Sequence, residues 1–327
     1  MHLPPFAAAL SLVAPDERPR VAAFIAVFSW PQTGQAFERR KSLRETWFPK
    51  SKLDMHRLQQ TSGLVARMAL GSHGLSQESH DALHAEAKEH GPFLWLPVQD
   101  SKEAGFLKVL AFWTEVICQY DARFILKADD DVYVNLEKVP MLLKQWDALE
   151  VGYGGCFLSK QAKKEDWPHE ISYFKDDLTA FAAGHFYGVP GAAVHGLVQL
   201  AAPFRFFSQE DVAVANWMKA LDVEFLDDSR LCADTCNHLA VAIPLHSRLP
   251  SQHQACKGDA DSDSAACMLE LHQTCNAQAG WHGDFEAHSS LLLPFIDWAE
   301  SAQVELNKRA DANCVGAACF EGLIASG

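Results

Sequence analysis

The first half of the chain alternates between apolar runs and polar segments. Residues 21–28 form a continuous apolar run, which is typical of a buried strand, and residues 64–71 alternate apolar side chains with others before a glycine. Residues 39–47 and 77–90 have the composition of helices, and the first of them stops before a proline. Residues 93–98 predict a third strand.

The same alternation continues up to an acidic triplet. A helix is indicated by apolar side chains at helical spacing, namely Phe106, Val109, Leu110, Trp113, Val116 and Ile117. Residues 124–126 predict a short buried strand, which runs directly into Asp129, Asp130 and Asp131. Strands that alternate with helices predict an α/β fold with a mostly parallel central sheet. In such sheets ligands bind beyond the carboxyl ends of the strands, and the three aspartates fall at such an end.

The pattern after residue 143 is weaker. Residues 152–155 indicate a glycine-rich turn, and residues 194–200 and 212–221 indicate helices. Residues 291–306 predict a terminal helix. The strands of the predicted sheet therefore lie before residue 143.

Composition narrows the class of protein. The chain has 327 residues, enough for one large domain or two ordinary ones, and its 48% hydrophobic and 21% charged residues exclude a disordered, collagen-like or coiled-coil protein. A formal net charge of −14 argues against nucleic-acid binding, which needs a basic face, and against attraction to anionic membranes. The longest early apolar run, residues 6–14, is shorter than the roughly 20 residues that span a bilayer.

The nine cysteines are unevenly distributed, since seven of them follow residue 230. This density predicts a disulfide-stapled C-terminal region in an oxidising compartment, and the odd number leaves at least one thiol outside any pair. Zinc binding through Cys232, Cys236 and later cysteines or histidines is the alternative. The chain lacks the paired ligand doublets that usually mark such a zinc site.

Three adjacent carboxylates repel one another, so a fold that keeps Asp129, Asp130 and Asp131 together needs a compensating charge. Hard oxygen ligands suit Mn²⁺ and Mg²⁺, and an Asp-x-Asp pair at a strand end points both side chains the same way. A metal held by Asp129 and Asp131 would keep positions open for a diphosphate. A solvated acidic turn explains the same triplet without a metal.

Three other features carry candidate chemistry. Glu210 and Asp211 begin a predicted helix, where Asp211 could act as general base toward a sugar hydroxyl, although interaction with the helix dipole explains the same placement. Arg40 and Arg44 lie four residues apart on one helix face and could bind phosphate, or could form a solvated face with neighbouring glutamates. His246 follows an apolar run and is a candidate third metal ligand, while most of the 15 histidines are expected to be structural or exposed.

In their order and spacing, these segments resemble the β-1,3-galactosyltransferase family (glycosyltransferase family 31), and most closely its plant and algal branch. The Lys-x-Asp-Asp-Asp-Val and Glu-Asp-Val segments are the most specific. The matching stretches cover roughly residues 21–240 and are RRKSLRETWFP, GLVARMALG, FLWLPVQDSKEAGFLKVLAFWTEV, ARFILKADDDVYVNLEKV, YGGCFLSK, FAAGHFYGV and SQEDVAVANWMKALDVEFLDDSRLC.

The resemblance implies a GT-A fold and an enzyme that transfers galactose from UDP-galactose, with inversion and with Mn²⁺, to a glycan or glycoprotein acceptor through a β-1,3 link. UDP-N-acetylglucosamine is the alternative donor, and a non-catalytic metal- or carbohydrate-binding protein is the alternative function. Family members are usually anchored in the Golgi membrane, so the resemblance also implies a lumenal enzyme with a membrane anchor, although no spanning segment is visible in the sequence.

The resemblance also carries over site residues and boundaries. The residues are the metal ligands Asp129, Asp131 and His246, the base Asp211, and the nucleotide or donor contacts Arg40, Arg44, Asp129, Asp130 and Gly184. Many family members have Gly-Gly-Gly-Tyr where this chain has Gly184-His-Phe-Tyr187, a departure that bears on donor choice. The implied divisions are a flexible lead-in (1–20), a GT-A domain (21–250, with a nucleotide-sugar half 21–150 and an acceptor half 151–250) and a cysteine-bearing C-terminal extension (251–327).

Overall fold

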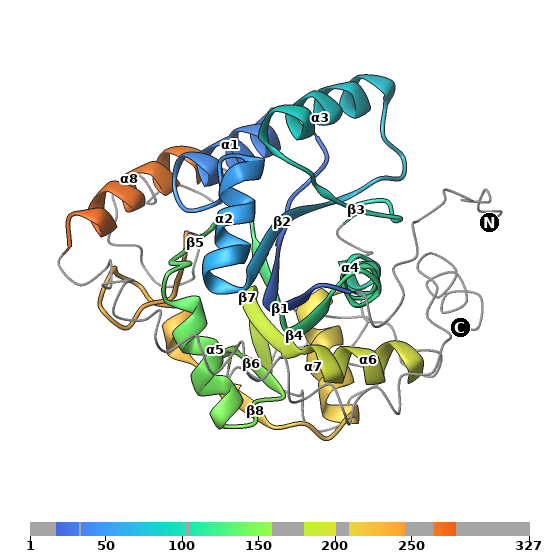
Figure 1. Ribbon diagram of the computed structural model, residues 1–327, viewed down its shortest axis with the longest axis vertical. Helices are drawn as coiled ribbons and strands as arrows, with labels where there is room; N and C mark the ends of the chain where they lie inside the picture. The colour runs from blue at the N-terminus through green and yellow to red at the C-terminus, as the bar shows by residue number, and fades with distance from the viewer. Residues whose placement is uncertain are drawn as a thin grey trace, which may run out of the picture.

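The computed structural model describes residues 18–32, 34–101, 105–158, 180–200, 209–245 and 264–278. Over these residues, a central sheet of seven strands has the order β3–β2–β1–β4–β7–β6–β8 (Figure 1). Its strands are β1 (Arg20–Phe28), β2 (Leu64–Gly71), β3 (Leu94–Leu96), β4 (Asp121–Asp129), β6 (Tyr153–Leu158), β7 (Phe181–Pro190) and β8 (Phe225–Asp227). A second, antiparallel sheet pairs β5 (Val132–Val134) with β9 (Ala242–Pro244).

The direction of the strands follows from their connections. Strands β1, β2, β3 and β4 run parallel because helices return the chain between them, whereas β7 runs antiparallel to both β4 and β6. The helices are α1 (Gln35–Glu45), α2 (Lys52–Ser62), α3 (Gln77–His90), α4 (Gly105–Gln119), α5 (Val139–Ala148), α6 (Gly191–Leu200), α7 (Glu210–Ala220) and α8 (Ser264–Asn276). The predicted α/β fold with a mostly parallel sheet is confirmed.

Two hydrophobic cores cover the two faces of the central sheet. Successive side chains of β1 point to opposite faces, so Ile25 and Val27 enter one core while Phe24 and Ala26 enter the other. The first core includes side chains of α1, α2, α3, α5 and α8, and the second includes side chains of α4, α6 and α7. This burial on both sides explains why residues 21–28 are apolar throughout.

The predicted glycine-rich turn at residues 152–155 is wrong, because β6 begins at Tyr153. The glycines of this stretch permit close packing. A Cβ on Gly154 would lie 2.6 Å from the ring of Trp146 on α5, and a Cβ on Gly155 would lie 2.3 Å from the Cβ of Ala182 on β7. The absence of side chains therefore lets β6 approach its neighbours closely, and no turn is formed there.

Both halves of the predicted domain contribute to one sheet. Strands β6, β7 and β8 come after residue 150, yet β7 pairs directly with β4 and carries β6 and β8. Most of the predicted lead-in and the whole predicted helix at residues 291–306 lie outside the described residues. None of the helices in the part of the chain that the structure describes is long and apolar enough to cross a membrane.

Disulfides tie the later part of the chain to the sheet. Cys156 of β6 is bonded to Cys232, and Cys236 is bonded to Cys275 at the end of α8, which packs against α1. The predicted disulfide-stapled region is thereby confirmed. The zinc alternative for Cys232 and Cys236 is wrong, because the two sulfur atoms belong to different disulfides.

Candidate active site

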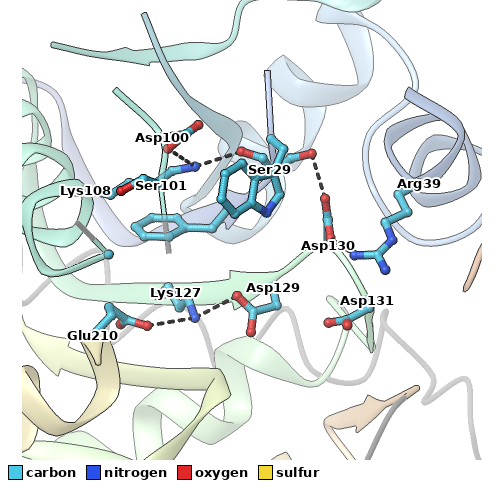
Figure 2. Close-up of a pocket in the computed structure, with 13 residues that line it drawn as sticks. Ser29, Arg39, Asp100, Ser101, Lys108, Lys127, Asp129, Asp130, Asp131 and Glu210 are labelled. Atoms are coloured by element: carbon cyan, nitrogen blue, oxygen red, sulfur yellow. Dashed lines mark hydrogen bonds and ion pairs between the residues drawn. The ribbon is translucent and has the colours of Figure 1, made fainter. Parts of the chain in front are cut away.

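A cavity of about 300 Å³ lies where strands β1 and β4 end. These parallel strands are in register, with Phe28 beside Asp129, so the residues that follow them meet at one edge of the sheet. Most of the lining side chains are charged, which makes the cavity a candidate site for a charged ligand. The lining consists of Phe28, Ser29, Trp30, Arg39, Asp100, Ser101, Gly105, Lys108, Lys127, Asp129, Asp130, Asp131 and Glu210 (Figure 2).

The first two aspartates of the acidic triplet have different partners. Asp129 pairs with the ammonium group of Lys127, 2.7 Å away, and 39% of its side chain is exposed. Asp130 is buried, and its two oxygens accept hydrogen bonds from Ser29 Oγ at 2.7 Å and from Arg39 Nη1 at 3.0 Å (Figure 2). Both oxygens of Asp130 therefore accept hydrogen bonds from protein groups at the edge of the cavity.

The electrostatics of the triplet favour a cation. Burial raises the pKa of Asp131 to about 7, and the neighbouring carboxylates of Asp129 and Asp130 add to the rise. Within the described residues, no three or more His, Cys, Asp or Glu side chains are grouped as a complete metal site. Asp129 and Asp131 nevertheless fit a divalent ion that is bound mainly by nucleotide phosphates, since Mg²⁺ in such sites uses only one or two protein carboxylates.

Lys127 of β4 connects three elements at the cavity. Its ammonium group donates to the carbonyl oxygen of Gly184 on β7, to Asp129 at 2.7 Å and to Glu210 on α7 at 3.1 Å. Burial lowers the pKa of Lys127, but the carboxylates of Asp129 and Glu210 more than offset this effect, so the pKa lies above the ordinary value for lysine. Lys127 is therefore a cation over the whole physiological pH range.

Asp211, the predicted base, lies beside Gly184. A Cβ on Gly184 would lie 3.6 Å from both Asp211 Oδ2 and Glu210 Oε2, and 3.5 Å from the ammonium group of Lys127. The structure thus brings Gly184 and Asp211, the predicted base, together near the end of β4, the strand that leads into the acidic triplet. Burial raises the pKa of Asp211 to about 7, and the charge of Glu210 adds to the rise. A carboxylate with this pKa is suited to accept a proton near neutral pH.

Arg40 and Arg44, the predicted phosphate ligands, do not line the cavity. Both are buried and paired with Glu86 of α3, at 2.8 Å from Arg40 and 2.6 Å from Arg44. Each guanidinium also lies over the ring of Phe93, 5.9 Å from its centroid. The structure therefore does not bring the two arginines to this cavity. The solvated-face alternative is wrong, because both arginines are buried and join α1 to α3 inside the protein.

The cavity instead receives Arg39, which precedes them on α1. Its Nη1 donates to Asp130, while its buried Nε has no hydrogen-bond partner among the residues that the structure describes. The sequence analysis also missed Lys108, which donates to the Ser29 carbonyl oxygen at 2.7 Å and pairs with Asp100 at 2.8 Å. Membership of the basic cluster was the available signal for Arg39. No local pattern marked Lys108 and Asp100, because the fold brings α4 against the loop after β3.

Two histidines bear on the predicted site. His246, the predicted third metal ligand, lies outside the described residues; the preceding Leu245 donates its backbone N–H to the Asp131 carbonyl oxygen at 2.9 Å. His185 stands at the position where the resemblance leads one to expect glycine, and within the described part of the chain its buried Nε2 has no hydrogen-bond partner. Burial lowers the pKa of His185 to about 4, and the charge of Asp129 only partly opposes this effect, so the imidazole is neutral.

A Rossmann-like sheet, an Asp-x-Asp pair at the end of β4 and a separate carboxylate on α7 together define a GT-A type glycosyltransferase. The family model described as Galactosyltransferase matches residues 38–229. The chain therefore belongs to the galactosyltransferase family, whose members include β-1,3-galactosyltransferases and are hexosyltransferases.

Curated relatives come from plants and animals. The chain is 29% identical over 250 residues to probable β-1,3-galactosyltransferase 1 of Arabidopsis thaliana, covering 73% of this chain and 64% of that protein. It is 28% identical over 262 residues to probable β-1,3-galactosyltransferase 13 of the same plant, covering 78% and 72%. It is 32% identical over 218 residues to β-1,3-galactosyltransferase 6 of Mus musculus, covering 65% of each chain. The chain thus spans about two thirds of the length of these relatives.

Proposed function

We propose that this protein transfers galactose from UDP-galactose to a hydroxyl group of a glycan or glycoprotein acceptor, with inversion, forming a β-1,3 linkage. The observation that carries the proposal is the placement of three groups near the end of β4. An Asp-x-Asp carboxylate pair and the Arg39 guanidinium line the cavity, and the carboxylate of Asp211, whose pKa burial raises to about 7, lies beside Gly184, next to Lys127 and Glu210. Family membership and the printed names of the relatives support galactose as the transferred sugar.

The cavity residues would bind the diphosphate of the donor. Asp129 and Asp131 would hold Mn²⁺, which when bound neutralises phosphate charge and favours departure of UDP. Arg39, fixed by Asp130, would donate to phosphate oxygens from its guanidinium group, which lines the cavity. Lys127 would keep the carboxylates of Asp129 and Glu210 in place while the donor binds.

Asp211 would act on the acceptor. As the acceptor hydroxyl oxygen attacks the anomeric carbon from the face opposite UDP, its proton passes to Asp211 and the bond between that carbon and the UDP oxygen breaks. The raised pKa matches this task, because a general base works best when its pKa lies near the operating pH. Gly184 would leave room for the sugar beside the base, since it projects no side chain toward Asp211.

The departure at residues 184–187 favours UDP-N-acetylglucosamine as the second candidate donor. His185 replaces a glycine that the resemblance leads one to expect and adds an imidazole, whose Nε2 atom has no hydrogen-bond partner among the described residues, whereas Phe186 is buried in the first core. The acetamido group of N-acetylglucosamine offers an amide N–H and a carbonyl oxygen where galactose has a hydroxyl group. Turnover of both UDP-sugars, measured side by side, decides between the two donors.

The proposal includes a lumenal location in the Golgi apparatus, with a membrane anchor as in the family. The disulfides Cys156–Cys232 and Cys236–Cys275 support this location, because disulfides persist in oxidising compartments and are rare in the cytosol.

The test combines binding with turnover. In the wild-type protein, UDP should raise the melting temperature only when Mn²⁺ is present, because a ligand stabilises the state that binds it. Asp131→Ala should lose this rise. Asp211→Asn should keep it but lose about 10²- to 10⁴-fold in transfer from UDP-galactose, the usual contribution of a general base. Galactose transfer at the wild-type rate by Asp211→Asn would refute the assignment of Asp211 as general base. A rise in melting temperature that UDP causes without Mn²⁺ would refute the metal site.

A further inference from the structure

The buried charges between β4 and α7 form a closed network. A lysine ammonium group has three hydrogens, and those of Lys127 are directed to three acceptors, one on each of β4, β7 and α7. Of these acceptors, the carboxylate of Glu210 is the one that belongs to the helix carrying the proposed base. Only 14% of the Glu210 side chain is exposed, so its contacts are made in a largely dehydrated environment.

Glu210 is held at both carboxylate oxygens. Oε2 accepts from Lys127 at 3.1 Å, and Oε1 accepts from the hydroxyl group of Tyr187 on β7. Helix α7 begins at this residue, and its N-cap residue Gln209 makes no side-chain hydrogen bond to the helix. The first turn of α7 is thus attached to the sheet through the side chain of Glu210.

We infer that Glu210 is a positioning residue for the transfer reaction: its carboxylate, fixed by Lys127 and Tyr187, holds the first turn of α7 so that Asp211 lies beside Gly184. The distances converge on one point, because Asp211 Oδ2 and Glu210 Oε2 would both lie 3.6 Å from a Cβ on Gly184. The inference rests on the proposed function, since it assigns a role toward the proposed base.

The same carboxylate acts on Asp211 through its charge. Burial and then the charge of Glu210 raise the pKa of Asp211, while Lys127 opposes the rise. Loss of the Glu210 charge therefore removes a repulsion and leaves Lys127 less compensated, and both effects lower the pKa of Asp211. The titratable groups that face Asp211 from its own helix and from the strands packed against it are Glu210, Lys127, Asp129, Tyr153 and Tyr187.

The decisive variant is Glu210→Gln, which keeps the shape of the side chain and removes its charge. With saturating Mn²⁺ and UDP-galactose, the acidic limb of the kcat profile should move down by about one pH unit, because one nearby charge is lost. The plateau kcat should fall about tenfold or more because a weaker base accepts the proton less readily, while KM for UDP-galactose stays within about twofold. Glu115→Gln is the matched control, because it neutralises a buried carboxylate on α4 that does not line the cavity, and its profile should overlay that of the wild type.

A second measurement does not depend on turnover. The carboxyl ¹³C resonance of Asp211, assigned by its absence in Asp211→Asn, should titrate near the value of about 7 in the wild type and at lower pH in Glu210→Gln. Such a shift in a protein that transfers no sugar would support the positioning role and refute the proposed function. If Asp211 titrates at the same pH in the wild type and in Glu210→Gln, the inference is overturned whether or not the protein transfers sugar.

A smaller change covers the case in which Glu210→Gln does not fold. Tyr187→Phe removes only the hydroxyl group that donates to Glu210 Oε1 and keeps the packing of the ring against Tyr153. This variant should shift the acidic limb of the pH profile of kcat measurably, in the same direction as Glu210→Gln, without weakening the binding of UDP. An unchanged profile in Tyr187→Phe, together with an unchanged Asp211 titration, would overturn the inference.

Discussion

Neighbouring residues of one type take different roles in this protein because their partners differ. Arg39 and Arg40 are consecutive on α1, but successive side chains of a helix point about 100° apart. Arg39 therefore reaches Asp130 at the cavity, whereas Arg40 reaches Glu86 inside the core. At this scale the identity of a residue indicates its chemistry, and the fold decides where that chemistry is available.

Arg39 should matter for binding of the nucleotide. We expect Arg39→Gln to weaken the affinity for UDP in the presence of Mn²⁺ by about tenfold or more, because a hydrogen bond between charged groups contributes about 1.5–3 kcal/mol. Lys41→Gln is the matched control, since Lys41 lies on the same helix with 52% of its side chain exposed. Calorimetric titration of UDP measures both variants. Equal affinity of Arg39→Gln and the wild type would exclude Arg39 from the phosphate site.

Glu86 should matter for stability instead. Glu86→Gln leaves two buried guanidinium groups without their carboxylate, so the free energy of unfolding should fall by about 3–5 kcal/mol, while the affinity for UDP stays the same. Burial tends to raise the pKa of Glu86, but Arg40 and Arg44 outweigh it and lower the pKa. Its contribution to stability is therefore complete above the unfolded-state pKa of about 4.3 and is lost as the pH falls through the lower folded-state value. Urea unfolding across this pH range tests both statements, and equal urea midpoints for Glu86→Gln and the wild type at neutral pH would contradict them.

At the scale of elements, the effect of a glycine on stability depends on the space around its Cα atom. We expect Gly154→Ala in β6 to lower the free energy of unfolding by about 1–3 kcal/mol, because the new Cβ would lie 2.6 Å from the Trp146 ring. Gly196→Ala in α6 should raise it by about 0.5–1 kcal/mol, since no atom of the described residues lies within 4 Å of that Cβ and glycine disfavours a helix interior. Thermal unfolding of the two variants checks the contrast, and similar melting temperatures for both would refute the packing argument.

Elements were predictable where local pattern and burial coincide. Strands β1 and β2 lie between two cores and are therefore apolar apart from Arg20 and Arg67, and α3 is exposed on one side and polar there. Strand β7 was missed because Gly184, His185 and Gly188 interrupt its apolar run. The glycines of β6 suggested a turn, because the sequence does not show that a tryptophan ring packs against them.

At the scale of the whole molecule, the site was predictable only where it is local in sequence. The acidic triplet and the Glu210–Asp211 pair could be found because each is a short segment at the end of a predicted element. The Lys127–Glu210 pair, the Lys108–Asp100 pair and the Arg40–Glu86 pair could not, because each joins residues that only the tertiary fold brings together. The partner of a charged residue, and so its role, is information that the sequence alone does not carry.

The disulfides connect stability to the site over the whole molecule. Cys236–Cys275 closes a separation of 39 residues and fixes α8, which packs against α1, the helix that carries Arg39. His272 of α8 also shares a hydrogen bond of 2.8 Å with Tyr133, which closely follows the acidic triplet. Helix α8 thus supports both sides of the proposed phosphate site.

Removing this disulfide should therefore affect both folding and binding. We expect the double variant Cys236→Ser, Cys275→Ser to lose about 2–4 kcal/mol of unfolding free energy, the usual effect of a native disulfide. It should also bind UDP with Mn²⁺ more weakly, by a few-fold, because Arg39 is held less firmly when α8 is released. The double variant Cys156→Ser, Cys232→Ser is the matched comparison: it opens a larger separation of 76 residues, should lose similar stability and should keep the wild-type affinity. Calorimetric titration at a temperature where both variants are folded separates the two effects. If both variants bind UDP as tightly as the wild type, α8 contributes to folding alone.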